Sequence, residues 1–186
     1  ITAALLEPNG KASPMLAAIW SMYRQGGVIA GTSAGAAIMS TTMFNKPKDV
    51  LSTLKLGVND GDEIADGLGF IGPHVFTDQH LIIRGRFARM LPVMLKKSYV
   101  LGLGIDENTA LLVRQQNEVE VIGYKGAILL DLSAVKLDSD DTEFHLKNAR
   151  ISYLSHGDRF MIASKQVFAA SDKTLISATP TGTSTR

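Results

Sequence analysis

A serine between two glycines gives the sequence its clearest chemical signal. Residues 31–35 read Gly-Thr-Ser-Ala-Gly, with Gly31 and Gly35 each two positions from Ser33. In a nucleophile elbow, a serine with this spacing lies on a tight strand-to-helix turn, where a Cβ on either glycine would clash. The hydroxyl then lies at a helix N-terminus, where free N–H groups stabilise an oxyanion. We expect Ser33 to be a nucleophile; the alternative is a structural turn that the serine caps.

The segments on each side of this serine have the composition that an elbow requires. Residues 28–30 are Val-Ile-Ala, an apolar run that predicts a strand covered on both faces of a sheet. The small residues 34–40 predict the helix that follows. This context favours the elbow over a chance pair of glycines.

A serine nucleophile needs a base, and the chain contains four histidines. His80 follows an apolar strand predicted over residues 70–77, at the kind of strand end where open α/β sheets form their active-site crevice. A packed or capping role is expected for His74, and His145 and His156 are expected to be solvated. We therefore choose His80 as the base.

The base in turn needs a carboxylate to orient it. Asp106 and Glu107 follow the apolar residues 99–105, at an equivalent strand end. Successive side chains leaving a strand point to opposite faces, so at most one of the two faces His80. The alternative is that the pair caps a helix or a turn.

Composition indicates one soluble domain with a sizeable core. The chain has 186 residues, of which 45% are hydrophobic, and a formal charge of +1, so it has no electrostatic footprint for nucleic acid. No apolar run is long enough to cross a bilayer. The absence of cysteine excludes a disulfide scaffold, thiolate metal sites and a cysteine nucleophile. A cluster of four acidic residues lacks the spacing of a calcium-binding loop and is expected to be solvated: Asp60, Asp62, Glu63 and Asp66.

Hydrophobic spacing predicts the remaining elements. Helices are expected over residues 1–25 and 81–97, and surface loops over 44–68 and 133–145. Short strands are expected over 99–106, 110–114, 118–122 and 127–132 and within 151–168. The order of elements indicates an α/β fold with a β-rich C-terminal part. We assign residues 1–176 to a single α/β hydrolytic domain and 177–186 to a flexible tail.

Three segments together resemble the cyanophycinase family, the serine exopeptidases of peptidase family S51 that are related to dipeptidase E. They are residues 28–36, residues 78–89 with their Asp-Gln-His and three arginines, and residues 102–110. The resemblance covers about residues 1–130. It implies a three-layer sandwich with a mostly parallel sheet, as in class I glutamine amidotransferases and flavodoxin.

The resemblance also implies a role for each candidate residue. Ser33 is the nucleophile, His80 the general base and Glu107 the orienting carboxylate, and the N–H of Ala34 belongs to the oxyanion hole. In the family, a glycine pair in an earlier loop supplies a second N–H. That loop would precede Ile1, so we expect the first strands of the sheet to lie outside this chain. Two alternatives stay open: a separate N-terminal fragment supplies them as a partner, or they were clipped from the protein.

The residues around His80 are expected to bind substrate. In the family, the equivalents of Arg84, Arg86 and Arg89 help hold cyanophycin, a poly-aspartate with arginine on each β-carboxyl. Guanidinium groups bind carboxylates in a bidentate way, while Asp78 and Gln79 would hold the arginine of the substrate. The alternative for such a basic segment is a solvated helix face.

The implied reaction releases β-Asp-Arg dipeptides from the polymer end through an acyl-enzyme, without a metal or organic cofactor. Two alternatives stay open: an α-aspartyl dipeptidase of the dipeptidase E type, and a non-catalytic member that binds an acidic polymer. A glutamine amidotransferase is disfavoured because the elbow has no cysteine. By analogy we expect a homodimer, with no nucleic acid or membrane as partner. The compartment stays open, with the cytoplasm favoured over a secreted or periplasmic location.

Overall fold

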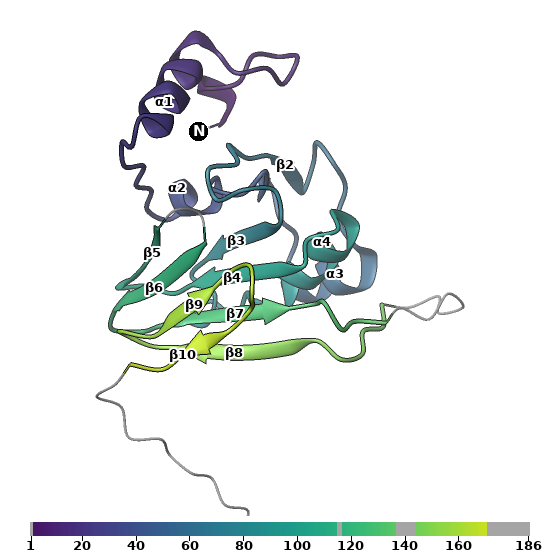
Figure 1. Cartoon of the computed structure of the whole chain (residues 1–186). Coiled ribbons are helices and arrows are strands. Elements are labelled where there is room, and N and C mark those ends of the chain that lie inside the picture. Colours follow the sequence, from purple (N-terminus) through teal and green to yellow (C-terminus); the bar gives the residue numbers. More distant parts are fainter. Residues whose placement is uncertain (1, 115–116, 137–143, 171–186) are drawn as a thin grey trace, which may run out of the picture.

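Figure 1 shows the computed structural model of the chain, which describes residues 2–114, 117–136 and 144–170. Its helices are η1 (Thr2–Ala4), α1 (Pro14–Arg24), α2 (Ala34–Ala37), α3 (Val50–Leu56), η2 (Phe87–Arg89) and α4 (Met90–Lys96). Its strands are β1 (Thr42–Phe44), β2 (Ile64–Asp66), β3 (Val75–Gln79), β4 (Leu101–Ile105), β5 (Thr109–Arg114), β6 (Glu118–Gly123), β7 (Ala127–Asp131), β8 (Arg150–Leu154), β9 (Arg159–Met161) and β10 (Val167–Phe168). The predicted tail, residues 177–186, and residues 137–143 of the predicted polar loop lie outside the described residues.

Two four-stranded sheets and a short hairpin make up the β-structure. One sheet has the order β3-β4-β7-β8 and the other β10-β9-β6-β5, while β1 pairs with β2. Among the described strands, only β3 and β4 pair in parallel, and the remaining pairs are antiparallel. The α/β class is therefore confirmed with mixed sheets, and the expectation of a mostly parallel sheet is wrong for these residues. The short connections in the β-rich half allow antiparallel pairing, whereas parallel pairing needs a long crossover.

The sheet β3-β4-β7-β8 separates two hydrophobic cores because alternate residues point to opposite faces. Leu103 and Leu129 face the core shared with Phe160 of the second sheet. Phe76 and Leu130 face the other core, where α4 packs together with the β1–β2 hairpin. Figure 1 shows α3 and α4 beside this first sheet and α1 apart from it, above α2.

Glycines in β4 allow close packing beneath the site. A Cβ on Gly104 would lie 1.9 Å from a methyl carbon of Leu81, and one on Gly102 would lie 2.6 Å from the sulfur of Met94. Leu81 is fully buried and directly follows His80. Because β4 has glycines here, the segment that follows β3 packs directly against the sheet. This contact fixes the position of Leu81 and, with it, that of His80.

The predicted strand at residues 28–30 is not present. Val28 is 82% exposed, and the backbone of Val28 to Gly31 makes no hydrogen bond to any part of the chain that the structure describes. An apolar run becomes a strand only when another strand pairs with it. The sequence signal was apolar composition, which carries no information about the partner.

Two helix predictions were too long, and one loop prediction missed a helix. In residues 1–25 the long helix begins only at Pro14, where the Ser13 hydroxyl accepts a hydrogen bond from the N–H of Leu16. In 81–97, Gly85 has a φ of 58° and ends the first turn, so η2 and α4 follow instead of one helix. The predicted loop 44–68 contains α3, which Asp49 caps by accepting from the N–H of Ser52.

No helix among the described residues is long and apolar enough to span a membrane.

Candidate active site

Ser33 lies on a strained turn at the start of α2. Its backbone has φ 54° and ψ −117°, a conformation that a residue with a Cβ rarely adopts and that is found mainly at functional sites. Its side chain is exposed. None of the hydrogen bonds within the described residues uses the N–H of Ala34, so this donor is free to bind an oxyanion beside the Ser33 hydroxyl.

The two flanking glycines are not equivalent. A Cβ on Gly31 would lie 2.2 Å from the carbonyl oxygen of Gly35, closer than any real contact. A Cβ on Gly35 would meet nothing within 4 Å. The expected clash is therefore found at Gly31, and the expectation was wrong for Gly35, because an added Cβ there would meet open space.

His80 reaches both of its predicted neighbours. Its Nε2 lies 3.1 Å from the Oγ of Ser33, and its Nδ1 lies 3.1 Å from Oε1 of Glu107. Both distances fit hydrogen bonds, and they use the two ring nitrogens in the order that a nucleophile, base and acid require. The parallel pairing of β3 with β4 brings His80 and Glu107 to the same sheet edge, since Gln79 is opposite Ile105.

Of the two adjacent acids, only Glu107 faces His80. Asp106 is buried, and its Oδ1 accepts a hydrogen bond from the N–H of Ile83 at 3.4 Å. Desolvation acts to raise the pKa of Glu107, but hydrogen bonds from His80 and Lys125, together with their charges, hold this pKa below its usual value. An ionised Glu107 accepts a hydrogen bond from the Nδ1–H of His80, which leaves Nε2 unprotonated and free to act as a base.

Asp78 and Arg89 form a buried, hydrogen-bonded ion pair. Nε and a terminal nitrogen of Arg89 donate to the two carboxylate oxygens of Asp78 at 2.8 and 2.7 Å. Their side chains are 1% and 5% exposed, and the guanidinium carbon lies 4.2 Å from the centre of the Phe44 ring. Both residues were expected to contact substrate, but in this arrangement they tie η2 to the end of β3 and do not reach the surface.

The other three predicted substrate residues remain accessible. Arg84 is half exposed, with one guanidinium nitrogen 3.9 Å from Oε1 of Glu107. Arg86 donates to Oε1 of Gln79 at 3.1 Å. Desolvation is the main reason why the pKa of Arg86 falls below its usual value, and the nearby charges of Arg89 and Arg84 add to this effect. Arg84 and Arg86 therefore place two cations close to the catalytic candidates.

The remaining histidines and acids lie elsewhere. His74, His145 and His156 are exposed, and the Nδ1 of His156 accepts the N–H of Gly123. Glu63 was expected to be solvated and is instead 1% exposed, because Lys48 pairs with it and the N–H of Asn59 donates to it. Among the described residues, no group of three or more histidines or acids is placed to hold a metal ion.

Sequence reasoning missed Lys125. Its Nζ lies 3.5 Å from Oε2 of Glu107, the carboxylate oxygen that His80 does not use. The lysine comes from the turn between β6 and β7, far from the motifs that pointed to the site. Its only sequence signal was the turn composition Gly-Tyr-Lys-Gly at residues 123–126.

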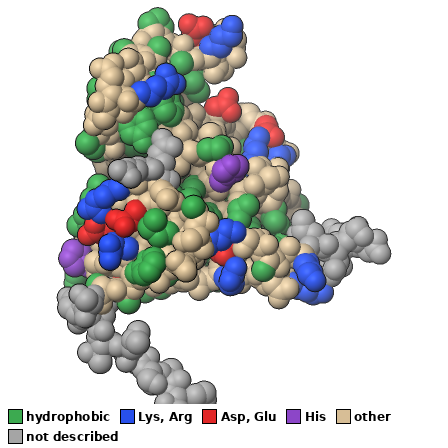
Figure 2. All heavy atoms as spheres, viewed as in Figure 1, with side chains coloured by type: hydrophobic (Ala, Val, Ile, Leu, Met, Phe, Trp, Pro, Cys, Tyr) green, Lys and Arg blue, Asp and Glu red, His purple; other side chains and the backbone are tan. Residues whose placement is uncertain are grey.

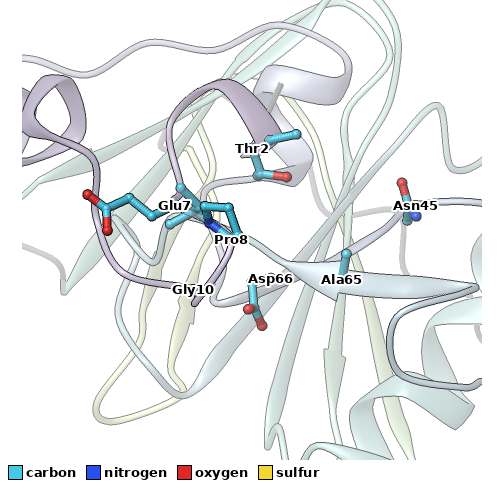
Figure 3. A pocket seen from close by; sticks show the side chains of 9 residues that line it. Thr2, Glu7, Pro8, Gly10, Asn45, Ala65 and Asp66 are labelled. Atoms are coloured by element: carbon cyan, nitrogen blue, oxygen red, sulfur yellow. The ribbon is translucent and has the colours of Figure 1, made fainter.

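A separate hollow of about 450 Å³ does not belong to this site. It lies between the N-terminal segment and the β1–β2 hairpin, and its lining residues include Glu7, Asn45 and Asp66 (Figure 3). Figure 3 shows the carboxylates of Glu7 and Asp66 pointing in different directions, so they do not converge on one ligand. None of the three catalytic candidates lines it.

An apolar groove of about 400 Å³ borders the elbow instead. Figure 2 shows hydrophobic side chains gathered around α1, next to which this groove runs. The groove lies between α1, the unpaired segment before Ser33 and the start of α2. Its lining residues are Leu5, Ile19, Val28, Ile29, Ala30, Gly31, Gly35, Ile38, Met39, Leu68 and Phe70.

Known proteins share sequence with most of this chain. The model of peptidase family S51 matches residues 6–122. Over 164 residues the chain is 34% identical to a cyanophycinase from Geminocystis herdmanii, an alignment that covers 84% of this chain and 58% of the relative. Over 171 residues it is 29% identical to a cyanophycinase from Trichormus variabilis, covering 85% of this chain and 53% of that relative. The chain thus spans little more than half the length of these relatives.

Proposed function

Because the chain belongs to peptidase family S51, we propose that it is part of a serine-type exopeptidase that hydrolyses cyanophycin to β-Asp-Arg dipeptides. The observation that carries this proposal is the continuous series of hydrogen-bonded side chains from Ser33 through His80 to Glu107. The choice of cyanophycin as substrate rests on the relatives, which are named cyanophycinase. Residues 1–176 would form the hydrolytic domain of this chain.

In the proposed mechanism, the Ser33 hydroxyl attacks the scissile carbonyl while His80 Nε2 takes its proton. The N–H of Ala34 donates to the oxyanion of the tetrahedral intermediate. His80 then returns the proton to the leaving amine, and the acyl-enzyme forms. Water, deprotonated by His80, then hydrolyses the acyl-enzyme, and His80 returns this proton to the Oγ of Ser33. Throughout, Glu107 holds the His80 ring and stabilises its protonated form.

The positions of the polar groups suggest how substrate binds. Arg84 and Arg86 are the accessible cations beside His80, and we assign to them the free carboxylates of the terminal dipeptide. Gln79 is assigned to the substrate arginine. Asp78 and Arg89 were predicted to bind substrate as well, and we now assign them the role of fixing the segment that carries Arg84 and Arg86.

One assay separates the candidate functions. The chain is incubated with soluble cyanophycin and, in parallel, with an Asp-Leu dipeptide, and products are identified by mass spectrometry. Release of β-Asp-Arg supports the proposal, whereas cleavage of Asp-Leu alone supports the α-aspartyl dipeptidase. Polymer binding without any product supports the non-catalytic member.

We propose further that the complete fold is the three-layer sandwich of this family. The relatives are longer than this chain, and the backbone of residues 28–31 has no partner among the described residues. A strand from a separate N-terminal fragment would pair there, cover the apolar groove and bring the second oxyanion N–H. Co-expression with such an N-terminal fragment should then raise turnover. The homodimer stays a proposal by analogy, which light scattering of the purified protein tests.

A further inference from the structure

Glu107 has a second partner on the side away from His80. Oε1 lies 3.1 Å from His80 Nδ1, while Oε2 lies 3.5 Å from the Nζ of Lys125. The two contacts hold the two oxygens separately, so the carboxylate cannot rotate without losing one of them. The Lys125 side chain is 30% exposed and that of Glu107 is 34% exposed, so water partly screens the pair but does not surround it.

The backbone of Lys125 is fixed to the backbone of Glu107 through a single hydroxyl. The Oγ1 of Thr109 donates to the carbonyl oxygen of Glu107 at 3.2 Å. The same oxygen accepts the N–H groups of Lys125 and Gly126 at 3.1 and 2.9 Å. On the other side of the turn, the Tyr153 hydroxyl donates to the carbonyl of Lys125 at 2.7 Å. The ammonium group is therefore carried by a turn whose distance from Glu107 is set by hydrogen bonds.

We propose that Lys125 is a positioning residue, which holds Oε2 of Glu107 so that Oε1 stays directed at Nδ1 of His80. This inference rests on the proposed function, because the orientation of His80 matters only if His80 acts as the base. Lys125 acts through Glu107 and has no assigned contact with the substrate.

Arg84 cannot take this role. It approaches Oε1, the oxygen already used by His80, at 3.9 Å, and its side chain is 52% exposed. If Arg84 binds a substrate carboxylate, its contact with Glu107 weakens during turnover, whereas Lys125 remains. The charged groups that face Glu107 are thus His80, Arg84 and Lys125, while Asp106 points into the protein.

The test compares Lys125→Met with Lys125→Arg, and uses Lys55→Met as a control that removes the same charge at an exposed site on α3. For Lys125→Met we expect kcat on cyanophycin to fall about tenfold, with KM changed less than about twofold. Loss of the positive charge that lowers the pKa of Glu107 eases protonation of this carboxylate, so the acid limb of the kcat/KM profile should move to higher pH by roughly 0.3 to 1 pH unit. Lys125→Arg should restore most of both values, and Lys55→Met should match the parent.

Two results would overturn this role: an unchanged pH profile and kcat in Lys125→Met, or a rise in KM alone, which would make Lys125 a substrate contact. A second readout is independent of turnover. Carbon-13 NMR of labelled glutamate should show that the pKa of Glu107 is higher in Lys125→Met than in the parent. If the parent releases no β-Asp-Arg even with the N-terminal fragment present, the proposed function fails, while an equal pKa of Glu107 in both proteins would refute the Lys125 contact itself.

Discussion

The carbonyl oxygen of Gly35 occupies the space where a side chain on Gly31 would begin, 2.2 Å from an ideal Cβ position. This contact exists because the chain reverses sharply at Ser33, where φ is positive. The reversal puts the Ser33 hydroxyl within 3.1 Å of His80 and leaves the adjacent N–H of Ala34 unpaired among the described residues. The close approach of two glycines is thus the structural basis of the proposed nucleophile.

Gly31→Ala should disable the elbow, whereas Gly35→Ala should be tolerated. The new methyl group at position 31 meets backbone that cannot move aside, which should cost about 1–3 kcal/mol and displace Ser33. At position 35 the methyl enters open space at a non-positive φ, so stability should be equal or about 0.5 kcal/mol higher. Urea unfolding and β-Asp-Arg release measure both effects. Equal behaviour of the two variants would contradict the asymmetry seen in the structure.

Breaking the Asp78–Arg89 pair should unfold or strongly destabilise the protein. Both side chains are at least 95% buried, so Asp78→Asn or Arg89→Met leaves a buried group without its charge partner, at a cost of about 3–5 kcal/mol. Arg84→Met, at an exposed position, should change stability by less than about 1 kcal/mol and mainly raise KM. Denaturant titration with a double-mutant cycle measures the coupling energy between Asp78 and Arg89. A coupling energy near zero would show that the pair does not hold η2 to β3.

Glu107→Gln should retain the fold and lose most of the activity. An amide can still contact His80, but it no longer stabilises the protonated ring or enforces the required tautomer, so kcat should fall by a factor on the order of 10²–10⁴. Circular dichroism checks the fold, and the matched control is Asp66→Asn on β2, an exposed acid that should leave kcat unchanged. Parent-like turnover in Glu107→Gln would remove this carboxylate from the mechanism.

Glu63 should make the protein sensitive to acid. The hydrogen bond from Lys48 and the N–H of Asn59 lower the pKa of Glu63 from 4.5 to about 2 in the folded state. A carboxylate whose pKa is depressed by folding stabilises the protein fully above its unfolded pKa, and this contribution disappears as the pH falls from about 4.5 towards 2. The free energy of unfolding of Glu63→Gln should therefore approach that of the parent as the pH is lowered. A constant difference between pH 6 and pH 3 would contradict the assignment.

The proximity of His80 and Glu107 followed from a local rule. Both were expected where a buried strand ends, and β3 and β4 do end side by side because they pair in parallel. Alternation at a strand end also explains why Glu107 faces His80 and Asp106 does not. The sequence alone predicted the positions of the strand ends. The resemblance to the family indicated which of the two acids to choose.

Three of the errors share a physical cause, because each depended on a contact with another part of the chain. Residues 28–30 are apolar enough for a strand but have no described partner with which to pair. Arg89 looks like a surface cation in a basic segment, and only the fold shows that Asp78 draws it inside. Lys125 lies on a turn 18 residues beyond Glu107, where spacing rules give no indication of a contact.

The most direct measurement is covalent labelling of the serine. The purified parent, Ser33→Ala and His80→Ala are treated with a fluorophosphonate, and intact mass and peptide mapping locate the adduct. One adduct on Ser33 in the parent, none in Ser33→Ala and much slower labelling in His80→Ala, together with loss of β-Asp-Arg release in both variants, is the expected result. Unlabelled parent protein that still releases β-Asp-Arg, or turnover that persists in Ser33→Ala, would show that Ser33 is not the nucleophile.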